Sequence, residues 1–186
     1  AQPVDAVKDS VDVFMDYITA VDTNDRLGLV VYNSSSGNGK VEIGLTEDLQ
    51  SVASTSRLRQ AGHYHSYTNI GAGMESARQE LQSNGRTGAF KMIVLMTDGV
   101  ANWHNGGYST SGARSHVLSE AAASAALNYP VVAISLGGGA DTGLMEDVAE
   151  ITESRHFNIP GGQSVASYRD DLFEVFRDIA DSRPLK

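Results

Sequence analysis

The chain contains no cysteine among its 186 residues, so neither a disulfide bond nor a thiolate metal site contributes to its structure. It has no run of about 18 apolar residues, the length that a membrane-spanning helix needs, and its first residues lack the zones of a signal peptide. Acidic residues outnumber lysine and arginine by 23 to 14, which gives a net charge of −9, and the basic residues do not cluster. These features argue against nucleic-acid binding and direct membrane insertion, and they favour a divalent cation or a basic partner.

Hydrophobic periodicity predicts one α/β domain. A chain of this length, with 41% apolar residues, can form a single sizeable core. Helices are expected over residues 3–21, 46–59 (capped by Thr46), 70–84, 116–128, 141–151 (capped by Asp141) and 168–180, and strands over 27–32, 40–45, 92–96, 131–136 and 157–159. The alternation predicts a doubly wound, mostly parallel sheet with helices on both faces and one antiparallel edge strand from the hairpin 27–45.

Asp98 is the first candidate for a functional residue. It follows the apolar run Met92 to Met96, which predicts a strand buried on both faces of a parallel sheet. Thr97, Asp98 and Gly99 would then lie at the carboxyl end of that strand, where ligands bind in open α/β sheets. The alternative is ordinary turn chemistry, because Asp-Gly is a common turn pair.

Thr68 and Asn69 precede a predicted helix, and two interpretations are open. Either residue can serve as an N-cap, since both side chains accept a hydrogen bond from a helix amide. Alternatively, Thr68 joins Asp98 as an oxygen ligand of a hard cation such as Mg²⁺. One hydroxyl and one carboxylate are too few for a complete site.

Aromatic residues gather in two predicted loops. Trp103, His104 and Tyr108 lie in the long segment 99–115, which has no apolar period, and Tyr64 and Tyr67 lie in the polar segment 61–69. Loops of such length in a compact domain are typical of binding segments or lids. These five residues are candidates for partner binding, with packing onto the domain's own helices as the alternative.

Three segments together resemble a von Willebrand factor type A domain: Tyr67-Thr68-Asn69-Ile70-Gly71-Ala72-Gly73-Met74, the run Met92 to Gly99, and Val131 to Leu136. The match covers nearly the whole chain in the right order. It implies a non-enzymatic protein-binding domain with a metal-ion-dependent adhesion site. In that family the site consists of an Asp-x-Ser-x-Ser loop after the first strand, a threonine that opens a helix and an aspartate that ends the fourth strand. Thr68 and Asp98 match the last two elements.

The resemblance also implies a cofactor and a partner. The metal would be Mg²⁺, or Mn²⁺ or Ca²⁺, and a carboxylate of an Asp or Glu on a protein partner would complete its coordination. The signature Tyr67 to Gly73 is most similar to bacterial members of the family, including those of Tad-type pilus-assembly proteins. This implies an exported or cell-surface location as part of a longer protein.

The Asp-x-Ser-x-Ser loop, however, is not in this sequence, and with it the family's central first strand is missing. We therefore expect the strands at Leu27 and Met92 to lie on either side of a strand-wide gap. Unpaired backbone groups cost about 1–3 kcal/mol each when buried. The hypothesis is an amino-terminally truncated domain, or one completed by a neighbouring chain's strand, with negligible Mg²⁺ affinity on its own.

Other readings of the residues are weaker. An enzyme of the doubly wound class would use Asp98 as a catalytic carboxylate and Gly137 to Gly143 as a phosphate loop, but that loop lacks Gly-Lys-Ser/Thr and contains Asp141. A third reading is a scaffold without metal. His63-x-His65 could chelate zinc but has no third ligand at a recognisable spacing, and Asn33-Ser34-Ser35 fits a glycosylation acceptor.

Overall fold

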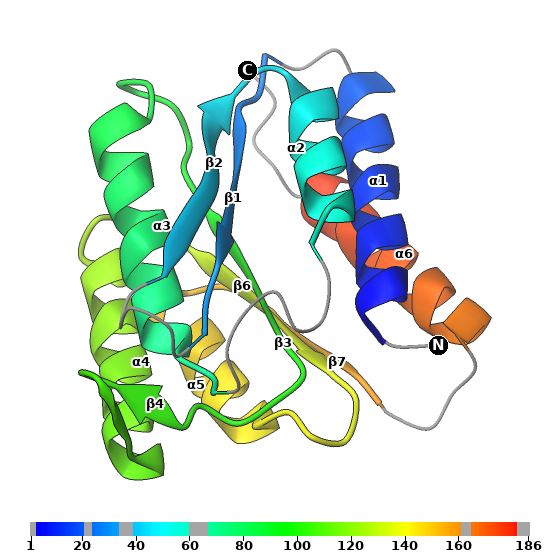
Figure 1. Ribbon diagram of the computed structural model, residues 1–186. Coiled ribbons are helices and arrows are strands. Elements are labelled where there is room, and N and C mark those ends of the chain that lie inside the picture. The colour runs from blue at the N-terminus through cyan, green and yellow to red at the C-terminus, as the bar shows by residue number, and fades with distance from the viewer. Residues whose placement is uncertain (1–2, 21–23, 34–38, 60–66, 161–164, 182–186) are drawn as a thin grey trace.

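A computed structural model describes residues 3–20, 24–33, 39–59, 67–160 and 165–181 of the chain. Helices and strands alternate along the chain (Figure 1), in the order α1 (Pro3–Ala20), β1 (Leu27–Val31), β2 (Lys40–Thr46), α2 (Leu49–Arg57), α3 (Ile70–Asn84), β3 (Ile93–Thr97), β4 (Trp103–His104), β5 (Gly107–Tyr108), α4 (Thr110–Ala125), β6 (Val131–Leu136), α5 (Thr142–Ile151), β7 (His156–Ile159) and α6 (Val165–Asp181). None of the described helices is long and apolar enough to cross a bilayer.

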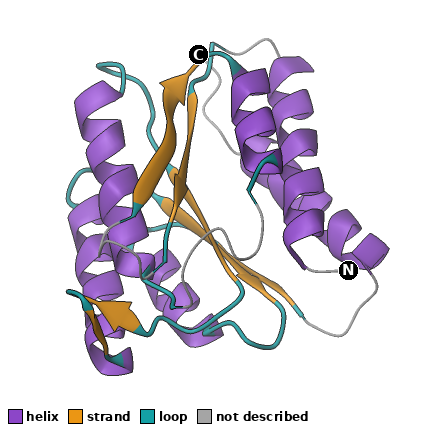
Figure 2. Ribbon diagram, viewed as in Figure 1, coloured by secondary structure: helices purple, strands orange, loops and turns teal. Residues whose placement is uncertain are grey.

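The strands form a parallel sheet and an antiparallel hairpin. β3, β6 and β7 pair in parallel in that order, with β6 in the middle, and β1 pairs with β2 in antiparallel fashion. The predicted α/β fold with a mostly parallel sheet and an antiparallel edge strand is therefore confirmed (Figure 2). Among the described strands, β1 pairs with β2 alone and β3 with β6 alone, so the two strands predicted to lie on either side of a gap are indeed not bonded to each other.

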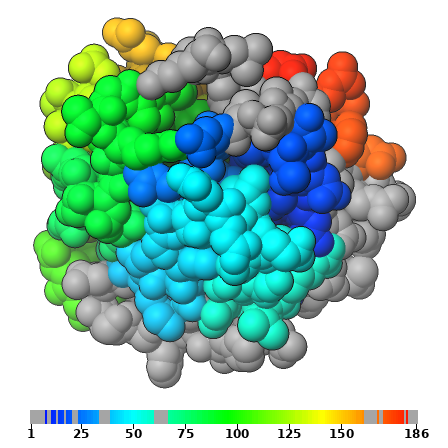
Figure 3. Space-filling view, turned by 90° about the horizontal axis from the view of Figure 1, so that it is seen from above, coloured from blue at the N-terminus to red at the C-terminus, as the bar shows by residue number. Residues whose placement is uncertain are grey.

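Helices cover both faces of the parallel sheet. Because strand residues alternate between faces, Val131 and Ala133 of β6 pack with helices α3, α4 and α5, while Val132, Ile134 and Leu136 pack with α1 and α6. Figure 1 shows these two helical groups on opposite sides of the strands. A third small cluster joins α1 and α2 to the hairpin through Val52 and Ala53. In Figure 3 the hairpin and α2, in light blue and cyan, occupy the centre of one face beside the dark blue α1.

The predicted long loop over residues 99–115 is wrong. Helix α4 begins at Thr110, where Ser109 is the N-cap and its hydroxyl accepts a hydrogen bond from the Gly112 amide at 3.1 Å. The first turns of α4 are polar and lack an apolar period, so periodicity placed the start at residue 116. Before the helix, β4 and β5 form a short hairpin. The helix also ends at Ala125, earlier than predicted.

Smaller corrections concern the element ends. Asp48, not Thr46, caps α2, because its carboxylate accepts a hydrogen bond from the Ser51 amide at 3.1 Å. The Thr46 hydroxyl instead accepts a hydrogen bond from the Asp48 amide at 3.0 Å. Asp141 caps α5 as predicted, and α6 begins at Val165, three residues before the predicted start.

Candidate functional site

Asp98 follows the last residue of β3 at the carboxyl edge of the parallel sheet. Its side chain is exposed, whereas the preceding Thr97 is 4% exposed. The Thr97 hydroxyl closes the turn, since it accepts a hydrogen bond from the Gly99 amide at 3.3 Å and donates one to the Gly99 carbonyl at 3.2 Å. Within the described residues the Asp98 carboxylate takes no part in the turn's hydrogen bonds, so local turn chemistry does not account for this aspartate.

The structure brings Thr68 next to this turn. A Cβ placed on Gly99 would lie 3.6 Å from the Thr68 hydroxyl oxygen. The backbone holds Thr68 in place, because its amide donates to the Asn102 side chain at 2.8 Å and its carbonyl accepts from the amides of Asn102 and Trp103 at 3.0 and 3.3 Å. Thus Thr68 lies beside the turn that follows β3, although the two segments are far apart in sequence. That Thr68 and Asp98 share a metal ion stays a prediction.

Asn69 supplies the N-cap of α3, which leaves the Thr68 hydroxyl out of that role. The Asn69 side chain is 1% exposed and accepts a hydrogen bond from the Ala72 amide at 3.4 Å. The two interpretations of the pair Thr68-Asn69 therefore apply to different residues: the asparagine caps, and the threonine hydroxyl faces the Asp98 turn. An oxygen pair of this kind suits Mg²⁺, which retains several waters, but it supplies only part of an octahedron.

Two further segments border the site. A Cβ on Gly139, in the loop between β6 and α5, would come within 2.8 Å of the Asp98 carbonyl oxygen. Tyr32, which follows β1, donates a hydrogen bond from its phenol to the Met96 carbonyl of β3. A tyrosine side chain therefore connects the hairpin to β3 where no backbone pairing does, within the described strands.

The Tyr32 phenol is sensitive to the charge on Asp98. Burial is the main cause that raises the pKa of Tyr32 to about 12, an interaction with the Thr97 side chain lowers it, and the negative charge of Asp98 raises it further. The ring also packs tightly on α3, because a Cβ on Gly73 would lie 2.6 Å from it. Sequence reasoning missed Tyr32 and Asn102, since neither carries a motif and only the fold places them beside the site.

Three of the predicted aromatic residues form one exposed cluster. Tyr67 stacks on Trp103 with ring centroids 4.8 Å apart and meets Tyr108 edge-on at 5.8 Å. Tyr67 is 45% exposed and Tyr108 is 65% exposed, while Trp103 of β4 is half-buried. Because Tyr67 adjoins Thr68 in sequence, this aromatic cluster lies next to the candidate metal edge.

The other predicted site residues lie elsewhere. The His104 ring packs on the first turn of α4, so close to Gly112 that a Cβ there would overlap its Nε2 at 1.9 Å. The His104 ring therefore packs the β4–β5 hairpin against α4. Tyr64, His63 and His65 lie outside the described residues. Asn33 is 7% exposed, which does not suit a glycan acceptor.

The loop from Gly137 to Gly143 offers no cradle for a phosphate. Asp141 occupies the helix N-terminus, where its carboxylate accepts a hydrogen bond from the Leu144 amide at 3.0 Å and pairs with the Arg114 guanidinium at 3.0 Å. Helix N-termini attract anions through free amides, and here a carboxylate of the chain already fills that role. The geometry therefore does not support the enzyme alternative at this loop.

A comparison with protein-family models shows to which family the chain belongs. The family model of the von Willebrand factor type A domain matches residues 1–168. The chain belongs to the von Willebrand factor type A family. Domains of this family are typically protein-interaction or adhesion modules. A comparison with curated protein sequences gave no match.

Solved structures show the same fold at low sequence identity. The protein BatB from Bacteroides thetaiotaomicron is 16% identical with a TM-score of 0.67, and the match covers 96% of this chain and 89% of that one. The SpRpn10 VWA domain is 16% identical with a TM-score of 0.67, covering 90% and 81%. Proximal thread matrix protein 1 from the mussel byssus, solved with a zinc-occupied MIDAS motif, is 21% identical with a TM-score of 0.68, covering 96% of this chain and 43% of that one.

Proposed function

We propose that this von Willebrand factor type A domain is a non-enzymatic, metal-dependent protein-binding module in which Thr68 and Asp98 ligate a divalent cation. The observation that supports this most directly is the position of the Thr68 hydroxyl against the Asp98-Gly99 turn. The expected ion is Mg²⁺, with Mn²⁺ or Ca²⁺ as substitutes, because the ligands are hard oxygens. When bound, the ion would accept one further carboxylate from an Asp or Glu of a partner.

The electrostatics of the edge fit this role. Asp98 is the single carboxylate of the pair, so a divalent ion held there keeps net positive charge and attracts a carboxylate from outside. Asp98 is exposed, which leaves it open to an ion and a partner. The aromatic cluster of Tyr67, Trp103 and Tyr108 lies alongside and offers the large, rigid side chains that recur at binding hot spots.

We further propose that an additional β-strand completes the site by pairing between β1 and β3 and by carrying an Asp-x-Ser-x-Ser loop at its carboxyl end. Both strands have a partner on one side only among the described strands. The Tyr32 phenol, just after β1, donates a hydrogen bond to the Met96 carbonyl of β3, so a side chain joins the two strands here in place of a backbone hydrogen bond. The strand would come from the same polypeptide or from a neighbouring chain. An exported or cell-surface setting, as in pilus assembly, is part of this proposal.

Calorimetric titration of Mg²⁺ and Mn²⁺ into the chain tests the site, alone and with a synthetic peptide. The peptide has about five or six apolar residues, an ordinary strand length, followed by Asp-Gly-Ser-Gly-Ser. We expect negligible binding by the chain alone and one bound ion per complex with the peptide. Asp98→Ala and Thr68→Ala should abolish or weaken that binding, whereas Glu150→Gln, which removes an exposed carboxylate of α5, should not.

Two outcomes would contradict different parts of the proposal. If the chain alone binds Mg²⁺ tightly and Asp98→Ala removes the binding, the site needs no added strand. If the peptide pairs with the chain but no ion binds, Thr68 and Asp98 are not ligands. Peptide binding is monitored independently by the protection of β3 amides from hydrogen exchange.

A further inference from the structure

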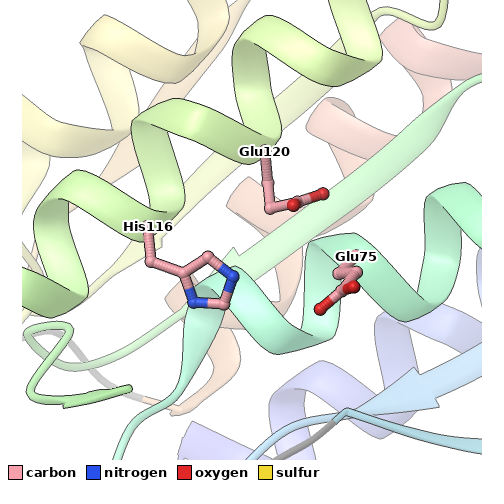
Figure 4. A group of neighbouring side chains, drawn as sticks. All are labelled: Glu75, His116 and Glu120. Atoms are coloured by element: carbon pink, nitrogen blue, oxygen red, sulfur yellow. The ribbon is translucent and has the colours of Figure 1, made fainter. Parts of the chain in front are cut away.

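A second group of metal-ligating side chains lies away from the sheet edge, between helices α3 and α4. Glu75 of α3 faces His116 and Glu120 of α4, and one potential ligand atom of each lies within 4.8 Å of the others. Figure 4 shows the three side chains directed into the space between the two helices. His116 and Glu120 are four residues apart, so they project from the same face of α4.

The histidine is held in this position by its fit against α3. A Cβ on Gly71 would lie 2.6 Å from the His116 Nδ1 atom, so only glycine allows the ring to approach the helix this closely. The Nδ1 atom on this side of the ring is buried and has no hydrogen-bond partner among the described residues, while Figure 4 shows the other ring nitrogen, Nε2, directed toward Glu75 and Glu120. The ring is therefore fixed against α3 with its Nε2 atom directed at the two carboxylates, the orientation that a ligand nitrogen needs.

The two carboxylates are partly engaged but not saturated. The Glu120 Oε2 atom accepts hydrogen bonds from the Arg78 guanidinium at 3.0 and 2.8 Å. Glu75 accepts a hydrogen bond from the Gln79 amide at 3.1 Å through Oε1. Among the described residues no hydrogen bond reaches the second oxygen of either carboxylate, so one oxygen of each remains for another ligand. The nearby Arg78 also limits the net negative charge of the group.

We propose that Glu75, His116 and Glu120 form a zinc site that joins α3 to α4. One imidazole nitrogen and two carboxylate oxygens give three protein ligands, and water would fill the fourth tetrahedral position. Zinc contacts nitrogen and oxygen at about 2.0–2.2 Å, so ligand atoms now within 4.8 Å need only small side-chain rotations to meet around one ion. An imidazole favours zinc over Mg²⁺ or Ca²⁺. This site is separate from the one at Asp98 and does not depend on it.

The reading without metal is an ion-pair network in which Glu120 holds Arg78 and His116 only fills space. The two readings predict opposite effects of replacing Arg78. Replacement of Arg78 weakens an ion-pair network, because the network loses its positive charge. It strengthens a metal site, because the guanidinium no longer competes with the ion for the Glu120 carboxylate. Arg78→Gln should therefore raise zinc affinity severalfold if the ion binds there.

The test is a calorimetric titration of Zn²⁺ into the intact chain, with the visible spectrum of bound Co²⁺ as a report on tetrahedral coordination by nitrogen and oxygen. We expect one ion per chain. Glu75→Gln, His116→Gln and Glu120→Gln should each weaken binding by about 100-fold or more, since even residues that only orient ligands contribute about 10–100-fold. Glu75→Gln is the cleanest variant, because Glu75 has one hydrogen bond to a side chain of its own helix.

Matched variants separate this site from others. Asp98→Ala removes the sheet-edge carboxylate and a His63→Ala/His65→Ala double variant removes the two histidines of the His63-x-His65 motif, and both should leave zinc binding unchanged. Loss of binding in either would place the ion elsewhere and overturn the proposal, as would unchanged affinity in Glu75→Gln and His116→Gln. The thermal unfolding of each metal-free variant shows whether it is folded, so a loss of structure is not mistaken for a loss of ligands.

Discussion

β6 and β1 are strands of similar length and composition, yet they occupy very different environments. All six residues of β6 are buried, and it has a partner strand on each side, β3 and β7. In β1, no residue is fully buried and the strand pairs with β2 alone. β3 combines both situations, since one edge pairs with β6 and the other faces the hairpin.

This difference divides the described strands into two parts that are joined in different ways. The well-formed side is built from β6 and its two neighbours, with helices packed on both faces. The other side is joined to it by side chains, of which the Tyr32 phenol on the Met96 carbonyl is the clearest case. Both candidate ligands lie at the end of this boundary: Asp98 directly follows β3, and Thr68 precedes α3, the helix that packs on Tyr32.

The largest expected effect concerns hydrogen exchange along β3. The Ile93 amide bonds to the Pro130 carbonyl, and the two-residue period of a strand then directs the Leu95 amide to β6 and the amides of Val94 and Met96 to the free edge. We expect Val94 and Met96 to exchange about a thousandfold faster than Leu95, because exposed edges open at far lower free energy than the core. Exchange monitored by NMR gives the rate of each amide.

A matched control is the central strand, where every amide of β6 should be as slow as that of Leu95. Addition of the Asp-Gly-Ser-Gly-Ser strand peptide should slow Val94 and Met96 without affecting β6. Equal protection of Val94 and Leu95 in the monomer without peptide would contradict the idea of an open edge.

The next largest expected effect is a difference between the two regions in how much free energy of unfolding a truncated side chain costs. Ile134→Ala on β6 should lower the free energy of unfolding by about 2–5 kcal/mol, the usual cost of truncating a fully buried aliphatic side chain. Leu29→Ala on β1 should cost about 1 kcal/mol, because that side chain is only partly buried. Urea denaturation followed by circular dichroism measures both. Similar losses would mean that the hairpin is packed as firmly as the central strand.

Much of the fold could be predicted from the sequence because buried strands are short apolar runs. β6 and the helix stripe of Leu144 and Val148 have the required period, and the structure buries both. The start of α4 could not be predicted this way, since its first turn, Thr110 to Ala113, is polar and is held by the Ser109 cap. That β1 and β3 do not pair with each other, among the described strands, was predictable only from the family resemblance and not from any local pattern.

The candidate site shows a similar division. Thr68 and Asp98 were predicted from motifs, and the structure places the Thr68 hydroxyl beside the Asp98-Gly99 turn, whereas their shared metal ion stays a prediction. His104 illustrates the limit: in sequence it is a polar residue in a loop, but in the structure its ring packs on α4. Likewise, the sequence gives no sign that Glu75, His116 and Glu120 meet, because the packing of α3 on α4 brings them together.

The smallest predicted effect tests whether Asp98 acts across the boundary on Tyr32. Burial raises the pKa of Tyr32 from 10.0 to about 12, and Asp98 adds to the rise. The folded state therefore keeps this proton when the unfolded state has lost it, so the phenol's contribution to stability is complete below pH 10 and declines as the pH rises through 12. Ultraviolet titration of tyrosinate absorbance, with Tyr32→Phe subtracted, isolates this group.

Asp98→Asn should lower the pKa of Tyr32 by less than burial raises it, because the aspartate is the weaker cause, while Asp147→Asn on α5 should leave it unchanged. If Asp98→Asn leaves the phenol's titration where it was, the carboxylate does not face the space that Tyr32 spans, and a strand inserted there would not bring its loop to Asp98.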